Sequence, residues 1–209
     1  MRGRVVGVEH PIPLLDGTRT TYVNLDNAST TPPLMEVMEE IQRFVPYYSS
    51  VHRGTGFKSR FCTRAYERAR ELMLRFVGAS PGSNTVVFGK NATEAVNKLA
   101  HRFGFSERAV VITTILEHHS NYLPWKGSAE VVVVGCTPEG RLDEADFDEK
   151  LARYGDRVEL VAVTGASNVT GFIQPIHGLA AKAHAAGAHI FVDAAQLAPH
   201  RRIDVLPDE

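Results

Sequence analysis

Hydrophobic residues follow two repeating patterns along this chain, one with the period of a helix and one typical of buried strands. Apolar side chains recur at helical spacing over residues 32–44 and again over residues 60–77. A proline at the start of the first stretch and Gly78 after the second are typical helix boundaries. The first third of the chain therefore predicts two helices, joined by a loop that is rich in serine, glycine and aromatic residues.

Beyond residue 84, short apolar runs alternate with helical stretches. Residues 131–134 are four consecutive valines, a pattern typical of a strand that is buried on both faces. Regular alternation of such strands with helices predicts a mostly parallel α/β sheet. After a short extended run at 22–26, the expected strands are residues 85–88, 109–113, 129–134, 158–164 and 189–192. The expected helices are residues 93–103, 143–154 and 176–186, with a helical turn near residue 121.

Polar residues follow four of these strands directly. In an open α/β sheet, ligands bind beyond the carboxyl ends of the strands, so these groups are candidates for a single site. The four clusters are residues 90–93, 117–119, 167–168 and 193–196.

Each cluster has candidate chemistry and a plainer structural explanation. Ala92 and Thr93 begin a helix, so their amides and the threonine hydroxyl could bind a phosphate, although Asn91 or Thr93 also suits a simple helix cap. His118 could stack on a flat aromatic ligand or could cap a turn. The pair with His119 lacks the spacing of two metal ligands on one helix face, so no metal site is expected.

Two further strand ends carry polar side chains. The carboxylate of Asp193 could keep a pyridinium nitrogen protonated, which makes the ring an electron sink. Gln196 is close enough in sequence to contact the same ligand, and Asn168 follows the neighbouring strand. Ordinary polar loops after strands would look the same.

Composition narrows the functional classes. The 209 residues are 44% hydrophobic and 22% charged, which is ordinary for a globular protein, and the net charge of −1 without a basic run argues against a nucleic-acid partner. We expect a cytoplasmic protein without membrane contact, because no apolar stretch approaches roughly 20 residues and no signal peptide is evident. Cys62 and Cys136 are far apart, so buried packing is expected for both rather than a disulfide.

Six motifs in one order resemble the class V aminotransferases, and the cysteine desulfurases among them in particular. The resemblance implies the α/β large domain of a pyridoxal 5′-phosphate (PLP) enzyme of fold type I, with a mostly parallel, mixed sheet of the seven-stranded type, truncated here. It also implies that residues 1–50 belong to the small domain or an N-terminal arm, and residues 51–209 to part of the PLP-binding domain. The motifs are Asp26-Asn-Ala-Ser-Thr30, Val51-His-Arg-Gly54, Ala92-Thr-Glu94, Glu117-His-His-Ser-Asn121 with Pro124-Trp125, Ser167-Asn-Val-Thr-Gly171 and Val192-Asp-Ala-Ala-Gln196.

The resemblance also implies roles for individual residues. Thr93 and the amide of Ala92 would bind the cofactor phosphate, and His118 would stack on the pyridine ring. Asp193 would pair with the pyridine nitrogen, and Gln196 with the phenolate oxygen. Asn168 would lie near that phenolate oxygen and near the substrate carboxylate, so it would contact both cofactor and substrate. His52 would line the active site, and Ala28 would belong to a loop near the substrate.

The family's Schiff-base lysine has no counterpart in this chain. The family carries it in a Ser-x-His-Lys-like segment on the strand after the aspartate that corresponds to Asp193. We therefore expect a partial chain that is inactive alone, without that lysine and without the small domain's carboxylate-binding arginine or any mobile catalytic cysteine. The lysines present, none in such a segment, are Lys58, Lys90, Lys98, Lys126, Lys150 and Lys182.

For the full-length protein, the resemblance implies a PLP-dependent enzyme that cleaves the C–S bond of cysteine to give alanine and sulfur. A homodimer and a sulfur-acceptor protein are the implied partners. Alternatives are another class V member (a selenocysteine lyase, a kynureninase-like enzyme, an epimerase or an aminotransferase), or a non-catalytic paralogue that binds PLP or serves as a dimer partner. An unrelated nucleotide-binding fold is disfavoured, because no G-x-G-x-x-G motif follows the strands.

Overall fold

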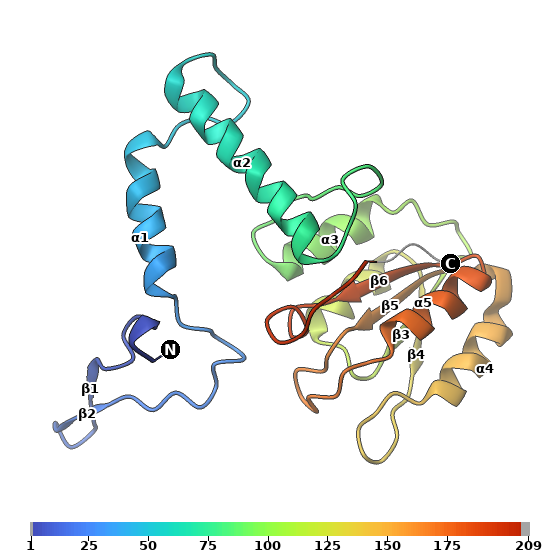
Figure 1. Cartoon of the computed structure of the whole chain (residues 1–209). Helices are drawn as coiled ribbons and strands as arrows, with labels where there is room; N and C mark the ends of the chain where they lie inside the picture. The colour runs from blue at the N-terminus through green and yellow to red at the C-terminus, as the bar shows by residue number, and fades with distance from the viewer. Residues whose placement is uncertain (1, 206–209) are drawn as a thin grey trace. The chain divides into compact units, whose positions relative to one another are not determined.

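The computed structural model describes residues 2–205 and shows two compact units, Met1–Leu72 and Met73–Glu209. The boundary between them falls within helix α2 (Phe57–Phe76). Figure 1 labels the elements of both units along the chain. The assignment of residues 1–50 to a small domain or arm and of residues 51–209 to the PLP-binding domain stays a prediction, because compact units of one chain do not test it.

The first unit consists of a small hairpin followed by helices. Strands β1 (Pro11–Pro13) and β2 (Arg19–Thr21) pair antiparallel after the 3-10 turn η1 (Arg2–Arg4). Helix α1 (Met35–Phe44) continues into the 3-10 turn η2 (Val45–Tyr47), and a loop then leads to α2. Helices α1 and α2 confirm the two helices that the apolar spacing predicted. The hairpin was not predicted, because three-residue strands show too little alternation to be recognised.

The second unit contains a four-stranded parallel sheet, which confirms the expected fold class. Its strand order is β4-β3-β5-β6, so β4 lies on one side of β3 and the later strands β5 and β6 lie on the other. The strands are β3 (Val110–Thr114), β4 (Glu130–Val134), β5 (Val158–Thr164) and β6 (His189–Asp193). The helices are α3 (Ala92–Arg102), α4 (Glu144–Tyr154) and α5 (Ile176–Ala185), with 3-10 turns η3 (His119–Asn121), η4 (Pro124–Gly127) and η5 (Gly155–Arg157).

Helices cover both faces of this sheet, as the alternation of side chains along each strand requires (Figure 1). Val110 and Ile112 of β3 face α4 and α5, where they pack with Phe147 and Leu179 in one core cluster. Val111 points to the opposite face and belongs to a second cluster with α3 and the buried ring of Trp125. Burial on both faces explains why the strands are nearly continuous apolar runs.

Two sequence expectations are wrong. Residues 85–88 form no strand; they belong to the loop between α2 and α3, and the ladders of the described sheet join only β3 to β6. A short apolar run becomes a strand only beside a neighbour of matching register. Cys136 is exposed rather than buried, because it lies two residues beyond the end of β4, whereas Cys62 is buried as expected.

Among residues 2–205, no helix combines the length and the apolar character that crossing a membrane requires.

Candidate functional site

A cavity of about 290 Å³ lies where three strands of the second unit end and helix α3 begins. The strands are β3, β5 and β6, which are neighbours in the sheet. This is the edge where an open α/β sheet binds its ligands. The structure brings together six of the predicted site residues in its walls: Ala92, Thr93, His118, Asn168, Asp193 and Gln196.

The N-terminus of α3 forms one wall. Asn91 caps the helix: its side-chain oxygen accepts a hydrogen bond from the amide of Glu94 at 2.9 Å, and its carbonyl accepts one from Ala95 at 3.2 Å. The Glu94 carboxylate accepts a hydrogen bond from the amide of Lys90, which lowers the pKa of Glu94. Ala92 and Thr93 carry the first two N–H groups of the helix and line the cavity. This wall therefore combines amide donors with the positive end of a helix dipole.

His118 lies at the end of the β3 segment and is held by its own turn. Its Nδ1 atom is 3.2 Å from the amide nitrogen of Ser120 and 2.7 Å from the Ser120 hydroxyl. A backbone N–H can only donate, so Nδ1 is an acceptor and the neutral ring carries its proton on Nε2. His119 is exposed and is not part of the cavity wall. The pair thus divides into one residue at the site and one in solvent.

Asp193 places a buried carboxylate in the cavity lining. Its side chain is only 7% exposed, and Oδ1 accepts a hydrogen bond from the amide of Ala195 at 3.0 Å. Gln196 and Asn168, which follow β6 and β5, complete this part of the lining. A carboxylate buried in this way favours a cationic or protonated partner, because an isolated buried charge is costly.

The sequence reasoning gave no role to Glu117, which is the most perturbed group near the site. Its carboxylate accepts hydrogen bonds from Thr114 Oγ1 at 2.6 Å, the Thr164 amide at 2.9 Å and Asn121 Nδ2 at 2.7 Å. Burial raises the pKa of Glu117 to about 7, and the charge of Asp193 acts in the same direction. Its position just after an apolar strand was visible in the sequence, but its burial depends on a strand 47 residues away.

The other two predicted residues, Ala28 and His52, belong to the first unit. His52 is the only non-glycine residue between 2 and 205 with a left-handed backbone, at φ 58°. Its Nε2 lies 2.9 Å from Glu67 Oε1, and its amide donates to Thr63 Oγ1 at 2.9 Å. Such a conformation costs free energy in a residue with a Cβ atom and often marks a functional loop.

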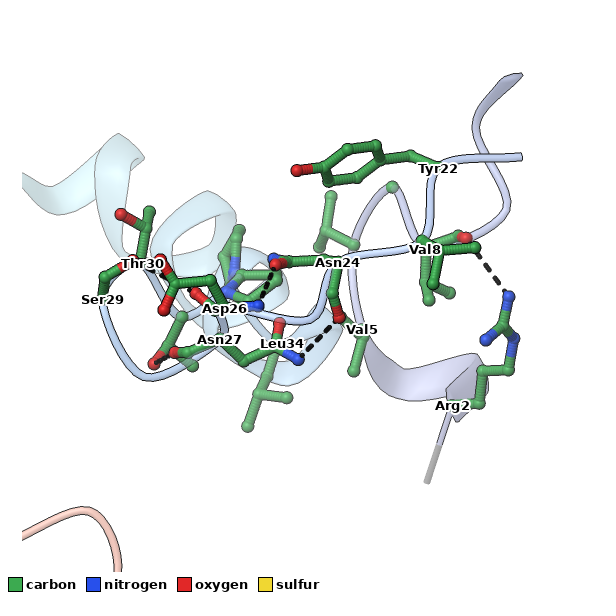
Figure 2. A pocket seen from close by; sticks show the side chains of 16 residues that line it. Arg2, Val5, Val8, Tyr22, Asn24, Asp26, Asn27, Ser29, Thr30 and Leu34 are labelled. Carbon is green, nitrogen blue, oxygen red and sulfur yellow. Dashed lines mark hydrogen bonds between the residues drawn. The ribbon is translucent and has the colours of Figure 1, made fainter. Parts of the chain in front are cut away.

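A larger hollow of about 760 Å³ lies within the first unit, against the loop that contains the Asp26-to-Thr30 motif. Figure 2 shows the segment around Asp26, which is held by its own hydrogen bonds: the Asp26 amide and Asn27 Nδ2 donate to Asn24, and the Ser29 hydroxyl donates to the Asp26 carboxylate. These side chains are exposed, and the groups satisfy one another locally. We therefore place the candidate site at the strand ends, where buried polar groups from distant segments converge.

The family model for aminotransferase class V matches residues 23–206, which is most of the chain. The chain belongs to this family. Class V aminotransferases are PLP-dependent enzymes, and the six motifs and the parallel sheet agree with this membership. The cavity at the strand ends therefore lies in a fold whose members use that cofactor.

The curated relatives of this chain include cysteine desulfurases. The chain is 37% identical over 91% of its length to a cysteine desulfurase of Haloferax volcanii, and 32% identical over 91% to a probable cysteine desulfurase of Streptomyces coelicolor. Among solved structures, it resembles an apo cysteine desulfurase of Thermococcus onnurineus (TM-score 0.78, 33% identity, 86% of this chain) and CsdA of Escherichia coli (TM-score 0.75, 30% identity, 98% of this chain).

The chain spans about half the length of the relatives that it matches. It covers 46% of the Haloferax protein, 47% of the Streptomyces protein and 50% of the Escherichia coli chain. Residues that those longer proteins carry outside the matched part have no counterpart in this structure.

Proposed function

We propose that the cavity at the strand ends binds PLP and that the whole protein is a cysteine desulfurase-type enzyme. The observation that carries the proposal is the joint position of a helix N-terminus and a buried carboxylate on the walls of one cavity. PLP has a phosphate and a basic ring nitrogen, which call for these two groups.

The phosphate end fits the start of α3. The amides of Ala92 and Thr93 and the Thr93 hydroxyl are donors, and the helix dipole favours an anion there. Asn91 already binds the Glu94 amide, so the cap does not compete for those donors. We assign the phosphate to Ala92 and Thr93.

The ring end fits the part of the lining that the strand ends supply. We assign His118 to one face of the pyridine ring, Asp193 to its nitrogen and Gln196 to its phenolate oxygen. When bound, PLP supplies an electron sink for a carbanion at the substrate Cα atom. Asp193 would hold a proton on the ring nitrogen, and its hydrogen bond from Ala195 would keep Oδ1 oriented. Because the Ser120 amide donates a hydrogen bond to its Nδ1 atom, the His118 ring would keep one orientation at the cavity wall.

We assign the substrate carboxylate to Asn168, with His52 and Ala28 on loops near the substrate. Cysteine is the proposed substrate, since the relatives named above are cysteine desulfurases or probable ones. C–S cleavage would then give alanine and sulfur, and the sulfur would pass to an acceptor protein. We propose that the whole enzyme acts as a homodimer. A cytoplasmic location goes with this proposal.

The first test is cofactor binding by this chain. We would titrate it with PLP, with pyridoxal and with inorganic phosphate by calorimetry, and repeat the PLP titration with Thr93→Val and Asp193→Asn. PLP should bind most tightly, Thr93→Val should weaken PLP but not pyridoxal, and Asp193→Asn should weaken both. Equal binding of PLP by both variants and the unchanged chain would reject the site.

The second test concerns the reaction. The coding sequence beyond Glu209 would be read, any longer chain expressed, and its absorbance recorded before and after adding cysteine. A lysine-bearing extension, a cysteine-dependent change in the visible band and formation of alanine, with sulfide released when a thiol reductant is added to reduce the transferred sulfur, support the desulfurase. A stop codon at this point, with reversible PLP binding only, would favour the non-catalytic paralogue instead.

A further inference from the structure

A largely buried network of hydrogen bonds surrounds Glu117, the residue that precedes His118 in the chain. Glu117 is its centre, and the donors to its carboxylate come from three segments: Thr114 at the end of β3, Thr164 at the end of β5, and Asn121 in η3. Asn121 is fully buried, and its backbone carbonyl oxygen accepts a hydrogen bond from the indole N–H of Trp125 at 2.8 Å. The carboxylate therefore joins two strand ends to the turn that begins at His118.

A buried carboxylate is an expensive way to make such a junction. Desolvation penalises its charge, as the pKa near 7 reflects, and the nearby Asp193 adds repulsion. An amide or an apolar side chain would fill the space at a smaller electrostatic cost. The feature that a carboxylate supplies is a pair of oxygens that accept from three donors at once, all between 2.6 and 2.9 Å.

The arrangement constrains His118 from both sides along the chain. Its preceding residue is tied to β3 and β5, and its following turn is tied to the same carboxylate through Asn121. Ser120 then holds the ring itself through Nδ1. The two ends of the segment 117–121 are thus fixed to one point, with His118 between them at the cavity wall.

We propose that Glu117 is a positioning residue of the site: by joining β3, β5 and η3 it sets where the His118 ring lies on the cavity wall. This inference rests on the proposed PLP site, because His118 receives its role there. Glu117 itself is not among the residues that line the cavity.

A double-mutant cycle separates this role from general stabilisation. We would measure the dissociation constant of PLP for the unchanged chain, Glu117→Gln, His118→Ala and the double variant. Glu117→Gln should weaken PLP binding roughly tenfold, the scale of one lost charged hydrogen bond. In the His118→Ala background the same change should cost less than about twofold, because residues that act through one another are not additive. Additive losses would overturn the proposal.

A second readout needs no ligand. Ring resonances of His118, observed by NMR with labelled histidine in the ligand-free chain, should shift in Glu117→Gln. They should stay in place in Glu149→Gln, which alters an exposed glutamate on α4. The indole N–H resonance of Trp125, the chain's single tryptophan, reports whether the network and the core remain folded.

The outcomes distinguish the two proposals. If the unchanged chain binds no PLP, the cofactor site fails, while a shift of the His118 ring in Glu117→Gln still supports the positioning role. If PLP binds and the His118 ring stays unmoved in a folded Glu117→Gln chain, the positioning role fails and the cofactor site stands.

Discussion

At the scale of single residues, the segment after β3 shows how neighbours in sequence acquire different surroundings. Glu117 is turned into the protein and accepts three hydrogen bonds, His118 lies on the cavity wall, and His119 is in solvent. The extended backbone of His118, with ψ 148°, before the 3-10 turn separates them in this way. Chemistry at this site therefore depends on which side of the chain each residue faces.

The raised pKa of Glu117 makes stability depend on pH. Because the folded chain holds this proton more tightly than the unfolded chain, unfolding releases it between the ordinary value of 4.5 and about 7. The free energy of unfolding should fall as the pH rises through this window, by roughly 3 kcal/mol from this group. Urea unfolding at about pH 5 and about pH 8 would measure the change.

The variant Glu117→Gln cannot titrate at this position. Its free energy of unfolding should therefore lose this part of the pH dependence, while Glu149→Gln should follow the unchanged chain. Parallel profiles for Glu117→Gln and the unchanged chain would show that Glu117 titrates at an ordinary pKa.

The residues predicted for the cofactor could be found from the sequence because each follows a strand or begins a helix. His118, Asn168 and Asp193 come from three separate strand-end clusters, and the topology of a parallel sheet brings such ends to one edge; Ala92 begins helix α3 beside them. Glu117 could not be assigned in the same way. A carboxylate after a strand is usually solvated, and only the donor from Thr164 on the neighbouring strand shows that this one is buried.

At the scale of elements, the start of α3 has two tasks that a substitution can separate. Asn91 caps the helix and also lines the cavity. Asn91→Ala should lose about 1 kcal/mol of stability. Asn91→Asp keeps a good cap but adds a negative charge beside the proposed phosphate position.

We therefore expect Asn91→Asp to be the more stable variant and the weaker binder of PLP, with binding of pyridoxal little changed. Thermal unfolding and calorimetric titration of both variants would check this. If PLP affinity simply followed stability, the phosphate would not lie at this helix end.

Gly165, which directly follows β5, has no room for a side chain. A Cβ atom there would lie 2.8 Å from Leu197 Cδ2, 3.2 Å from Leu197 Cβ and 3.3 Å from Val192 Cγ1. Gly165→Ala should displace the segment that carries Asp193 and Gln196, destabilise the chain by roughly 1–3 kcal/mol and weaken PLP binding.

Gly178 in α5 is the matched control for this substitution. An added Cβ atom there meets nothing within 4 Å, so Gly178→Ala should be neutral or stabilising by up to about 1 kcal/mol through helix propensity. Urea unfolding and PLP titration of both variants give the comparison. Similar behaviour of the two alanine variants would mean that Leu197 yields without moving the site.

Helices and central strands were predictable because their patterns are long. The predicted bounds of α4, β5 and α5 differ from the observed ones by no more than one residue at either end. The failures are short: the hairpin β1–β2 and residues 85–88, where three or four residues leave the outcome to tertiary neighbours.

At the scale of the whole molecule, the two compact units carry different parts of the predicted site. The second unit contains every residue assigned to the cofactor, whereas Ala28 and His52, assigned to the substrate loops, belong to the first. Cofactor binding can therefore be tested on residues of one unit, but substrate binding cannot. The relatives are about twice as long as this chain, so turnover is a question for a longer protein.

Lysine chemistry distinguishes cofactor binding from catalysis in this chain. Among the residues that the structure describes, none of the six lysines lines the cavity. Lys98, Lys150 and Lys182 form ion pairs with nearby carboxylates. PLP should accordingly bind this chain reversibly, without a lasting covalent bond to a lysine at the site, and cysteine should not be turned over.

Treatment of the PLP-loaded chain with sodium borohydride, followed by peptide mass spectrometry, measures this directly. Reduction fixes any lysine bound to the PLP aldehyde, so the expected result is a chain that releases PLP on dialysis and shows no stoichiometric adduct. Asp193→Asn is the control for labelling outside the site, because scattered surface labelling would persist in it. The contrary result would be a single reduced adduct on Lys90, next to the α3 cap, that is lost in Asp193→Asn. Such an adduct would show that a lysine of this chain reaches the ring, and it would contradict the prediction that this chain cannot turn over cysteine.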